Sequence, residues 1–398
     1  MSEFNQILAS CKKKTYQLFS LGCRVNQAEI SVIGGYLEKL GFYSDKKNPD
    51  IIIINTCAVT KKALIESKRE LLKLKRKYPK AKIIILGCGV EFKPQDFALA
   101  DFLFNNIAKE KILDFNLTYS PAAGLPLARS KRHLLRIQSG CNNFCTYCLV
   151  PFLRNKLISI SPNKIIKTIK KAEKLGFQEI ILTGTNLELY GEGFGYNLSH
   201  LLEKILFQTK IPRIGLGSVN LEAIDDKFIR LYTQDWKQER GRLNRYLHIP
   251  LQSASNKILL KMNRPYKIEN YQKVIKRLAK NIPFLGIGTD LVVGFPGETK
   301  KDFKKTVSFV KKMPFSRLHV FRYNPRPGTL SAKKETEWGS IENKIKQERA
   351  KVLRKIGEQK KKEFKKKIIG QKLNVLVLRK RKNYWQALTD NYVLLKIT

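Results

Sequence analysis

The first third of the chain alternates short apolar runs with amphipathic segments. Residues 51–54 and 83–86 are apolar runs rich in isoleucine, and residues 16–22 form a third, less apolar run. Runs of this length and composition are typical of strands buried on both faces of a parallel sheet. Helical patterns cover residues 27–40 and 61–77, between the runs. Residues 1–117 are therefore predicted to form one Rossmann-like α/β domain.

Strands and helices alternate again after a turn-rich linker at residues 118–132. Six such strands with interleaved helices predict an open (β/α)6 barrel over residues 133–340, with its chemistry at the carboxyl ends of the strands. A basic helix is expected at residues 341–368, and a small β unit of three short strands at residues 369–398. The six barrel strand candidates are residues 134–137, 179–182, 214–216, 246–249, 288–293 and 318–321.

Charge and hydropathy narrow the class of protein. The chain has 398 residues and a formal net charge of +44, an excess that attracts polyanions such as RNA or DNA. The densest basic stretch, residues 344–367, suits a helix whose lysines could equally form a solvated face. No apolar run reaches the ~20 residues of a membrane span, and the N-terminus has no signal-peptide core. We therefore expect a soluble cytoplasmic protein without a membrane partner.

Three cysteines share one short loop at the start of the barrel region: Cys141, Cys145 and Cys148. A closed structural zinc site needs four ligands, and ordinary iron–sulfur clusters also take four cysteines. A triplet suits a cubane cluster that is held at three corners and keeps one iron open. Chance crowding of inert thiols is the alternative, although buried cysteines are normally scattered.

A second set of cysteines follows the three N-terminal runs: Cys23, Cys57 and Cys88. Parallel strands joined by helices end at one edge of the sheet, where ligands bind. These cysteines are expected to converge there and to provide a second three-cysteine site, although three unrelated core thiols would give the same pattern. Cys11 fits neither set. The four histidines show no metal-ligand spacing: His133, His200, His248 and His319.

With both triplets in place, the chain resembles the radical S-adenosylmethionine (SAM) methylthiotransferases over nearly its full length. That family combines an N-terminal cysteine domain, a radical SAM barrel and a C-terminal RNA-binding β unit, the TRAM domain. The terminal unit here looks like a truncated TRAM domain. Besides the cysteines, the resemblance is carried by residues 21–27 (LGCRVNQ), 182–186 (LTGTN), 248–253 (HIPLQS), 262–266 (MNRPY) and 294–299 (GFPGET).

The resemblance implies the cofactors and several site residues. Two [4Fe-4S] clusters and SAM are expected, with Cys141, Cys145 and Cys148 holding the SAM-cleaving cluster. Cys23, Cys57 and Cys88 would hold the auxiliary cluster that handles sulfur. Tyr147 would lie against the SAM adenine, or is a core aromatic. Gln252, Ser253 and Gly294 would contact SAM or substrate, or serve turns.

The resemblance also implies the reaction. Residues 24–27 (RVNQ) are most similar to the bacterial branch that methylthiolates C2 of N6-threonylcarbamoyladenosine beside the tRNA anticodon. Isopentenyladenosine in tRNA, a ribosomal-protein aspartate, and a non-catalytic iron–sulfur RNA-binding protein are the alternatives. The threonylcarbamoyl carboxylate needs a cation, for which Arg24, Arg322 and Arg326 are candidates or solvent-facing arginines. Expected partners are tRNA and an electron donor such as flavodoxin or ferredoxin.

Overall fold

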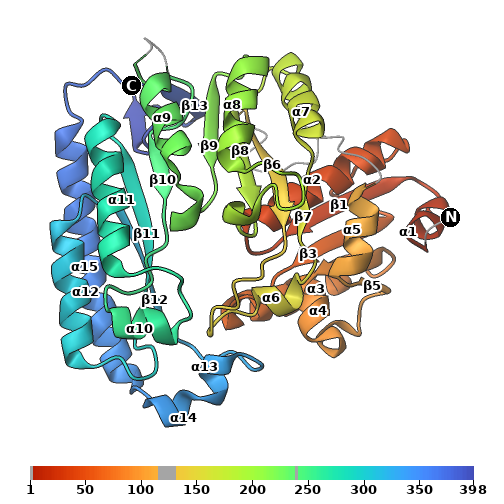
Figure 1. Ribbon diagram of the computed structural model, residues 1–398. Coiled ribbons are helices and arrows are strands. Elements are labelled where there is room, and N and C mark those ends of the chain that lie inside the picture. The colour runs from red at the N-terminus through yellow and green to blue at the C-terminus, as the bar shows by residue number, and fades with distance from the viewer. Residues whose placement is uncertain (1–2, 115–130, 238–240) are drawn as a thin grey trace.

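The computed structural model describes the chain except residues 1–2, 115–130 and 238–240. In Figure 1 the N-terminal α/β domain, red to orange, lies against one side of a larger barrel, yellow to blue. The linker expected at 118–132 falls almost wholly outside the described residues. The α/β class and the barrel are confirmed, and so are all six barrel strands.

The N-terminal sheet is parallel throughout, with the order β2-β1-β3-β4-β5. Alternate residues of the apolar runs pack against helices on opposite faces: Ile51 and Ile53 on one, Ile52 and Ile54 on the other. The elements are α1 (Glu3–Ala9), β1 (Thr15–Ser20), α2 (Arg24–Lys39), β2 (Tyr43–Ser44), β3 (Ile51–Thr56), α3 (Lys61–Lys77), β4 (Lys82–Gly87), α4 (Cys88–Phe92), η1 (Pro94–Phe97), β5 (Phe102–Phe104) and α5 (Asn106–Asp114).

The barrel strands are parallel neighbours in chain order, and bridges from Ile214 to Leu243 and from Ser218 to His248 join its two halves. The strands are β6 (Arg132–Ser139), β8 (Glu179–Gly184), β9 (Arg213–Leu216), β10 (Tyr246–His248), β11 (Gly286–Val293) and β12 (Arg317–Arg322), with β7 (Ile158–Ser159) antiparallel to β6. The helices are α6 (Val150–Leu153), α7 (Pro162–Lys174), η3 (Leu187–Leu189), α8 (Leu198–Gln208), η4 (Leu221–Ala223), α9 (Asp226–Asp235), α10 (Asn256–Lys261), α11 (Ile268–Asn281), α12 (Lys300–Lys312), α13 (Leu330–Lys333), α14 (Glu335–Trp338) and α15 (Asn343–Lys367).

Helix α2 of the N-terminal domain packs on the inner side of the barrel wall. Ala28 of α2 forms a small buried cluster with Leu134 of β6 and Ile181 of β8. The neighbouring residues Leu135 and Ile180 belong instead to the large core between strands and outer helices. Since successive strand residues face opposite sides, α2 packs against the inner face of β6 and β8.

The basic helix α15 completes the outer layer of the barrel. Its buried face includes Ala350, Leu353 and Ile356, and it packs against β12. Lys360, expected on a solvated or RNA-binding face, donates from Nζ to the carbonyl oxygen of Met313 at 3.0 Å. The first part of this stretch therefore stabilises the fold, and the exposed lysines concentrate toward its end. Among the described residues, no helix is both long and apolar enough to span a bilayer.

The C-terminal strands form an antiparallel sheet that covers the amino-terminal end of the barrel. The strands are β13 (Val375–Lys380), β14 (Trp385–Thr389) and β15 (Leu394–Ile397). Arg245 pairs with Asp390 at 2.8 Å, and Arg132 Nη2 donates to the hydroxyl of Tyr392 at 2.7 Å. These buried contacts hold the small β unit as the floor of the barrel.

Glu29 of α2 is a fully buried carboxylate that ties the N-terminal domain to the barrel. It accepts hydrogen bonds from Lys109 Nζ at 2.7 Å, Arg154 Nη1 at 2.7 Å and Arg136 Nη1 at 3.3 Å. Arg136 pairs in addition with Glu110 of α5 at 2.8 Å. Burial opposes ionisation of Glu29, but Arg154, Lys109 and Arg136 outweigh it and hold its pKa well below the ordinary range. The carboxylate therefore stays charged.

We expect Glu29→Gln to lower the free energy of unfolding of the full chain by about 3–5 kcal/mol in urea titrations, because it leaves buried cations without their counter-charge. The depressed pKa of Glu29 determines how this stabilisation depends on pH. The stabilisation is fully present above the unfolded-state pKa near 4.5 and is lost as pH falls through the lower folded-state value.

Glu110→Gln is the matched control, since Glu110 also pairs with Arg136 but is partly exposed. Glu110→Gln should lower the free energy of unfolding by about 1 kcal/mol or less. If both variants are destabilised by the same amount, the buried carboxylate is not what holds the two domains together.

Candidate active site

Three cysteines of the N-terminal domain converge at the carboxyl edge of its sheet. Cys23 immediately precedes α2, Cys57 follows β3, and Cys88 is the first residue of α4 after β4. The strands β1, β3 and β4 that lead to them are adjacent in the sheet. We refer to Cys23, Cys57 and Cys88 as the N-terminal thiol group.

Gly22 allows the loops of this group to approach one another. Its φ is +92°, which favours glycine, and a Cβ there would lie 2.6 Å from the Sγ of Cys57. Asn26 fixes the same loops, because its Nδ2 donates to the carbonyl oxygens of Leu21 at 2.9 Å and Thr56 at 2.8 Å. A side chain at position 22 would fill the space beside the sulfurs.

Cys57 and Cys88 of the N-terminal thiol group are buried, and Cys23 is exposed. Burial raises the pKa of Cys57 to about 11, and the surrounding protein also raises the pKa of Cys23. Repulsion from the other thiolates of the group contributes to both shifts, whereas Arg154 favours the charged form. Metal ligation requires thiolates, which a neighbouring guanidinium stabilises.

Cys141, Cys145 and Cys148, which we call the barrel thiol group, occupy the loop after β6. Gly140 enters the loop with φ +88°, and a Cβ there would lie 2.2 Å from the carbonyl oxygen of Lys156. Thr146 fastens the loop to the opposite wall: its N–H donates to Met262 O at 3.1 Å and its Oγ1 to Lys261 O at 2.8 Å. Burial raises the pKa of Cys148 to about 12.

Each sulfur of the barrel thiol group has an N–H donor nearby. Such donors stabilise thiolates and tune the potential of iron–sulfur centres. Two of the donors come from residues 182–186 and 262–266, stretches that carry the family resemblance but had no role assigned from sequence. The pairs are Asn186 Nδ2 with Cys141 at 3.7 Å, Arg264 Nη1 with Cys145 at 3.6 Å, and the N–H of Val150 with Cys148 at 3.4 Å.

Neither thiol group has the sulfur–sulfur distances expected when three thiolates bind a single metal ion. Sulfur ligands around one zinc lie ~3.8 Å apart, given a Zn–S distance of about 2.3 Å. In the described part of the chain, neither group brings its three sulfurs within 4.8 Å of one another. Three thiols at wider spacing, with cationic and N–H donors beside them, fit a cluster with one open iron.

Helix α6 connects the two thiol groups. Leu149 precedes α6 and Leu153 ends it, and both are buried in the same apolar cluster as Cys88. Asn106 Nδ2 donates to the carbonyl oxygen of Leu153 at 2.6 Å and lies 3.6 Å from the Sγ of Cys88. Because Cys148 directly precedes Leu149, one short packed segment fixes the position of one thiol group relative to the other.

Gln252 and Ser253 lie in the segment that follows β10, which ends at His248. Gln252 has φ +68°, an uncommon conformation for a residue with a side chain, and its N–H donates to Asp290 O at 2.8 Å. Ser253 is buried, and its Oγ accepts from the N–H of Ser255 at 3.2 Å. This hydrogen bond stabilises a turn, so a role for Ser253 with SAM or substrate stays a prediction.

Tyr147 and Gly294 lie at the same end of the barrel, because Tyr147 packs against Phe295, the residue after Gly294. The Tyr147 ring packs edge-on against Phe295 at 6.4 Å, and burial raises its pKa well above the ordinary range. Gly294 has φ +71°, and a Cβ there would lie 2.3 Å from Cγ of Lys346. Both residues therefore have packing roles, and their contacts with SAM stay predictions.

The three candidate arginines lie in different surroundings. Arg24 begins α2, is exposed, and acts electrostatically on the hydroxyls of Tyr246 and Tyr392 at the barrel floor. Arg322 ends β12 and is exposed. Arg326 lies beside the N-terminal thiol group, where its Nη2 donates to the carbonyl oxygen of Ala58 at 2.6 Å.

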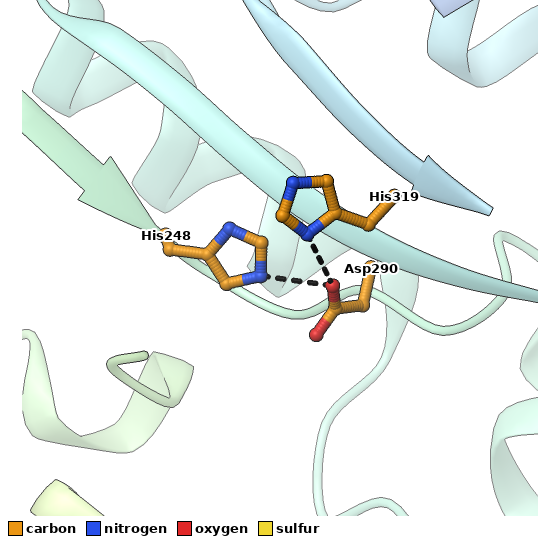
Figure 2. A group of neighbouring side chains, drawn as sticks. All are labelled: His248, Asp290 and His319. Atoms are coloured by element: carbon orange, nitrogen blue, oxygen red, sulfur yellow. Dashed lines mark ion pairs between the residues drawn. The ribbon is translucent and has the colours of Figure 1, made fainter. Parts of the chain in front are cut away.

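Two histidines that sequence spacing did not connect meet at one carboxylate inside the barrel (Figure 2). Asp290 Oδ1 lies 2.9 Å from His248 Nε2 and 3.4 Å from His319 Nδ1. The residues come from β10, β11 and β12, and His319 is the directly paired neighbour of Asp290. We call these three residues the lumen group.

Comparison with known proteins agrees with this geometry. The radical SAM superfamily model matches residues 135–310, and the model of an uncharacterized protein family, UPF0004, matches residues 15–104. The fold is similar to radical SAM methyltransferase TsrM from Kitasatospora setae, with a TM-score of 0.60 and 11% identity over 81% of this chain and 77% of that chain. The barrel, its cysteine loop and these matches define a radical SAM enzyme.

Two curated relatives narrow the class. Threonylcarbamoyladenosine tRNA methylthiotransferase MtaB of Aquifex aeolicus is 32% identical, over 95% of this chain and 95% of its own length. The tRNA-2-methylthio-N(6)-dimethylallyladenosine synthase of Clostridium novyi is 32% identical over 81% of this chain and 77% of its own. The chain belongs to the radical SAM methylthiotransferase family, which uses SAM and [4Fe-4S] clusters.

We expect the variant with alanine at Cys141, Cys145 and Cys148 to retain about half of the iron of the anaerobically reconstituted protein. The physical reason is that the N-terminal thiol group is built by a separate sheet edge and stays intact. Iron and acid-labile sulfide analysis measures the result.

Alanine at Cys11 is the control. Its thiol is buried and contacts the carbonyl oxygen of Ile7 at 3.5 Å, so the variant should keep all its iron. Complete loss of iron from the folded triple variant would contradict two independent sites.

Proposed function

We propose that this enzyme methylthiolates C2 of N6-threonylcarbamoyladenosine next to the anticodon of tRNA. The observation that carries the proposal is the pair of three-cysteine groups, one in each domain, joined by α6. The barrel thiol group would hold the SAM-cleaving cluster and the N-terminal thiol group the auxiliary one. When bound, these cofactors supply radical activation of an unreactive C–H bond and the sulfur to be attached.

The chain's own residues would position the groups and exclude water. The Leu149–Leu153 packing holds the two cysteine sets at a fixed separation, and α2, which follows Cys23, packs against the inner face of β6 and β8. Asn186 and Arg264 would donate to the sulfurs of the SAM-cleaving cluster. Effective catalysis between separately bound reactants depends on such fixed geometry. Electron supply by a flavodoxin or ferredoxin, and a cytoplasmic location, are parts of the same proposal.

An open basic groove supports tRNA as the partner. It has a volume of about 1490 Å³ and runs between α5, β7 and α7. Its floor includes Ser139 and Arg154, so it reaches the loop that carries Cys141. The lysines that line it are Lys39, Lys111, Lys156, Lys164, Lys167, Lys170, Lys171 and Lys174. A concave row of cations suits a phosphate backbone.

The threonylcarbamoyl substrate is favoured over an isopentenyl one by the polarity of the barrel interior. Arg24 and the lumen group place charge where an apolar substituent would have to bury against it without compensation. The Aquifex relative that bears the threonylcarbamoyladenosine name also aligns over more of this chain than the Clostridium synthase.

We expect the reconstituted enzyme to convert threonylcarbamoyl-modified tRNA to its 2-methylthio derivative, measured by mass spectrometry of digested nucleosides. Isopentenyl-modified tRNA is the comparison substrate. Under the same conditions it should react at least tenfold more slowly. Preferential reaction of the isopentenyl tRNA would assign the enzyme to the other branch, and SAM cleavage without either product would favour another substrate.

We expect tRNA affinity to fall steeply with salt. Replacing the four groove lysines Lys164, Lys167, Lys171 and Lys174 with glutamine should flatten the slope of log K against log salt. The slope should change by about 0.7–0.9 for each phosphate that the variant no longer neutralises. Filter binding at several salt concentrations measures it.

A matched set of four lysines near the end of α15 serves as comparison: Lys361, Lys362, Lys365 and Lys366. These residues are also exposed. A change of slope in this set alone would move the tRNA-binding surface from the groove to the basic helix.

A further inference from the structure

Asp290 and His319 of the lumen group are partly exposed, whereas the side chain of His248 is almost fully buried. A side chain that serves packing is normally buried, but the side chain of His319 is 45% exposed and that of Asp290 is 22% exposed. Both lie in the middle of well-paired strands, and they face the interior rather than the outer helices. Three polar side chains side by side in a barrel interior indicate a binding role.

The geometry orients the imidazole of His319. One oxygen of Asp290 lies within ion-pair distance of one ring nitrogen of each histidine, 2.9 Å from His248 Nε2 and 3.4 Å from His319 Nδ1. Figure 2 shows that the other ring nitrogen of His319, Nε2, points away from Asp290. Within the described residues Nε2 has no hydrogen-bond partner. His319 therefore offers a free ring nitrogen whose orientation is fixed by the carboxylate behind it.

The strand that carries His319 has a cationic side chain at each end. Arg317 begins β12, with its guanidinium 5.9 Å from the ring of Tyr246, and Arg322 ends it. An imidazolium has a proton on each ring nitrogen, so His319 in that form can hold Asp290 at Nδ1 and an anionic group at Nε2.

The lumen group lies next to the predicted reaction site. The N–H of Gln252 donates to the backbone oxygen of Asp290, so the segment that follows β10 and the lumen group share one backbone hydrogen bond. In adenine, C2 and N6 lie on either side of N1. A base with C2 directed at the thiol groups therefore carries its N6 substituent to a neighbouring part of the barrel wall.

We propose that His319, oriented by Asp290 and backed by His248, binds the carboxylate of the N6 substituent and determines substrate specificity. The inference rests on the proposed function, because an isopentenyl group has no carboxylate. The same three residues are also a possible ligand set for a divalent metal. A bound divalent ion would occupy the ring nitrogens that face Asp290, so metal analysis separates this use of the lumen group from carboxylate binding.

The test is His319→Gln in the reconstituted holoenzyme. KM for threonylcarbamoyl tRNA should rise about tenfold or more, while kcat, iron content and SAM binding stay as in the unsubstituted enzyme. Removal of an interaction made equally in the ground and transition states has this signature. His200→Gln is the control, since His200 is an exposed helix-capping histidine on α8, and it should change none of these quantities.

A modified substrate makes the test specific to charge. For tRNA whose threonyl carboxylate is converted to the amide, KM should rise about tenfold with the unsubstituted enzyme and change little with His319→Gln. Such non-additivity identifies a direct interaction between the two altered groups. Asp290→Asn should shift KM in the same direction as His319→Gln.

Four results would overturn the inference. If His319→Gln leaves KM unchanged, or if the amide raises KM equally with both enzymes, His319 does not bind the carboxylate, although the proposed function stands. If the unsubstituted enzyme prefers isopentenyl tRNA, the function and the inference fail together. If metal analysis finds one zinc or other divalent ion besides the iron, and His319→Gln removes it, the lumen group is a metal site.

Discussion

The buried carboxylate of Glu29 is the constraint on which the arrangement of the two domains depends. It belongs to α2, yet two of its three cationic partners, Arg136 and Arg154, come from the barrel. A buried charge cannot be left unpaired without a large free-energy cost. The domains therefore have one relative position in which all these charges are satisfied, and α2 is held against the inner face of β6 and β8.

The same charge network also fixes the positions of the two thiol groups. Arg154 donates to Glu29 and to Asn26 Oδ1, and Asn26 fixes the loops around Cys23 and Cys57. On the barrel side, Arg154 comes directly after α6, which follows the barrel thiol group. The charge network and the apolar packing of α6 thus act on the same short segment. A chemistry that joins events at two clusters requires this kind of fixed separation.

The C-terminal sheet and helix α15 take structural roles that their composition does not suggest. Tyr392 stacks on Tyr246 with ring centroids 4.6 Å apart and accepts from Arg132, so the terminal unit forms the floor beneath the lumen. This places aromatic and cationic side chains at the base of the barrel. The exposed lysines remaining on α7 and α15 then provide the charge that attracts a polyanion.

The local patterns of the chain were sufficient to predict the central strands of the N-terminal sheet, the six barrel strands, the long helices α2, α3 and α15, and both cysteine sets. The short strands β2, β5 and β7 were not predicted. Apolar runs define buried strands by themselves, and cysteines that follow adjacent parallel strands must converge at one edge. The assignment of those cysteines to clusters, like the roles of Tyr147, Gln252 and Gly294, stays a prediction.

Proximity between residues far apart in the chain could not be predicted in this way. His248, Asp290 and His319 have no regular spacing, because they meet through the register of three parallel strands separated by long helical crossovers. The contact between Glu29 and Arg154 could not be predicted from their spacing either. Arg326 lies beside the N-terminal thiol group, a position that its place after β12 does not predict. Sequence determined which segments form strands, helices and thiol-bearing loops, since these follow from local periodicity. Only the tertiary structure decided which charged side chains share a buried site, since that depends on how the segments pack.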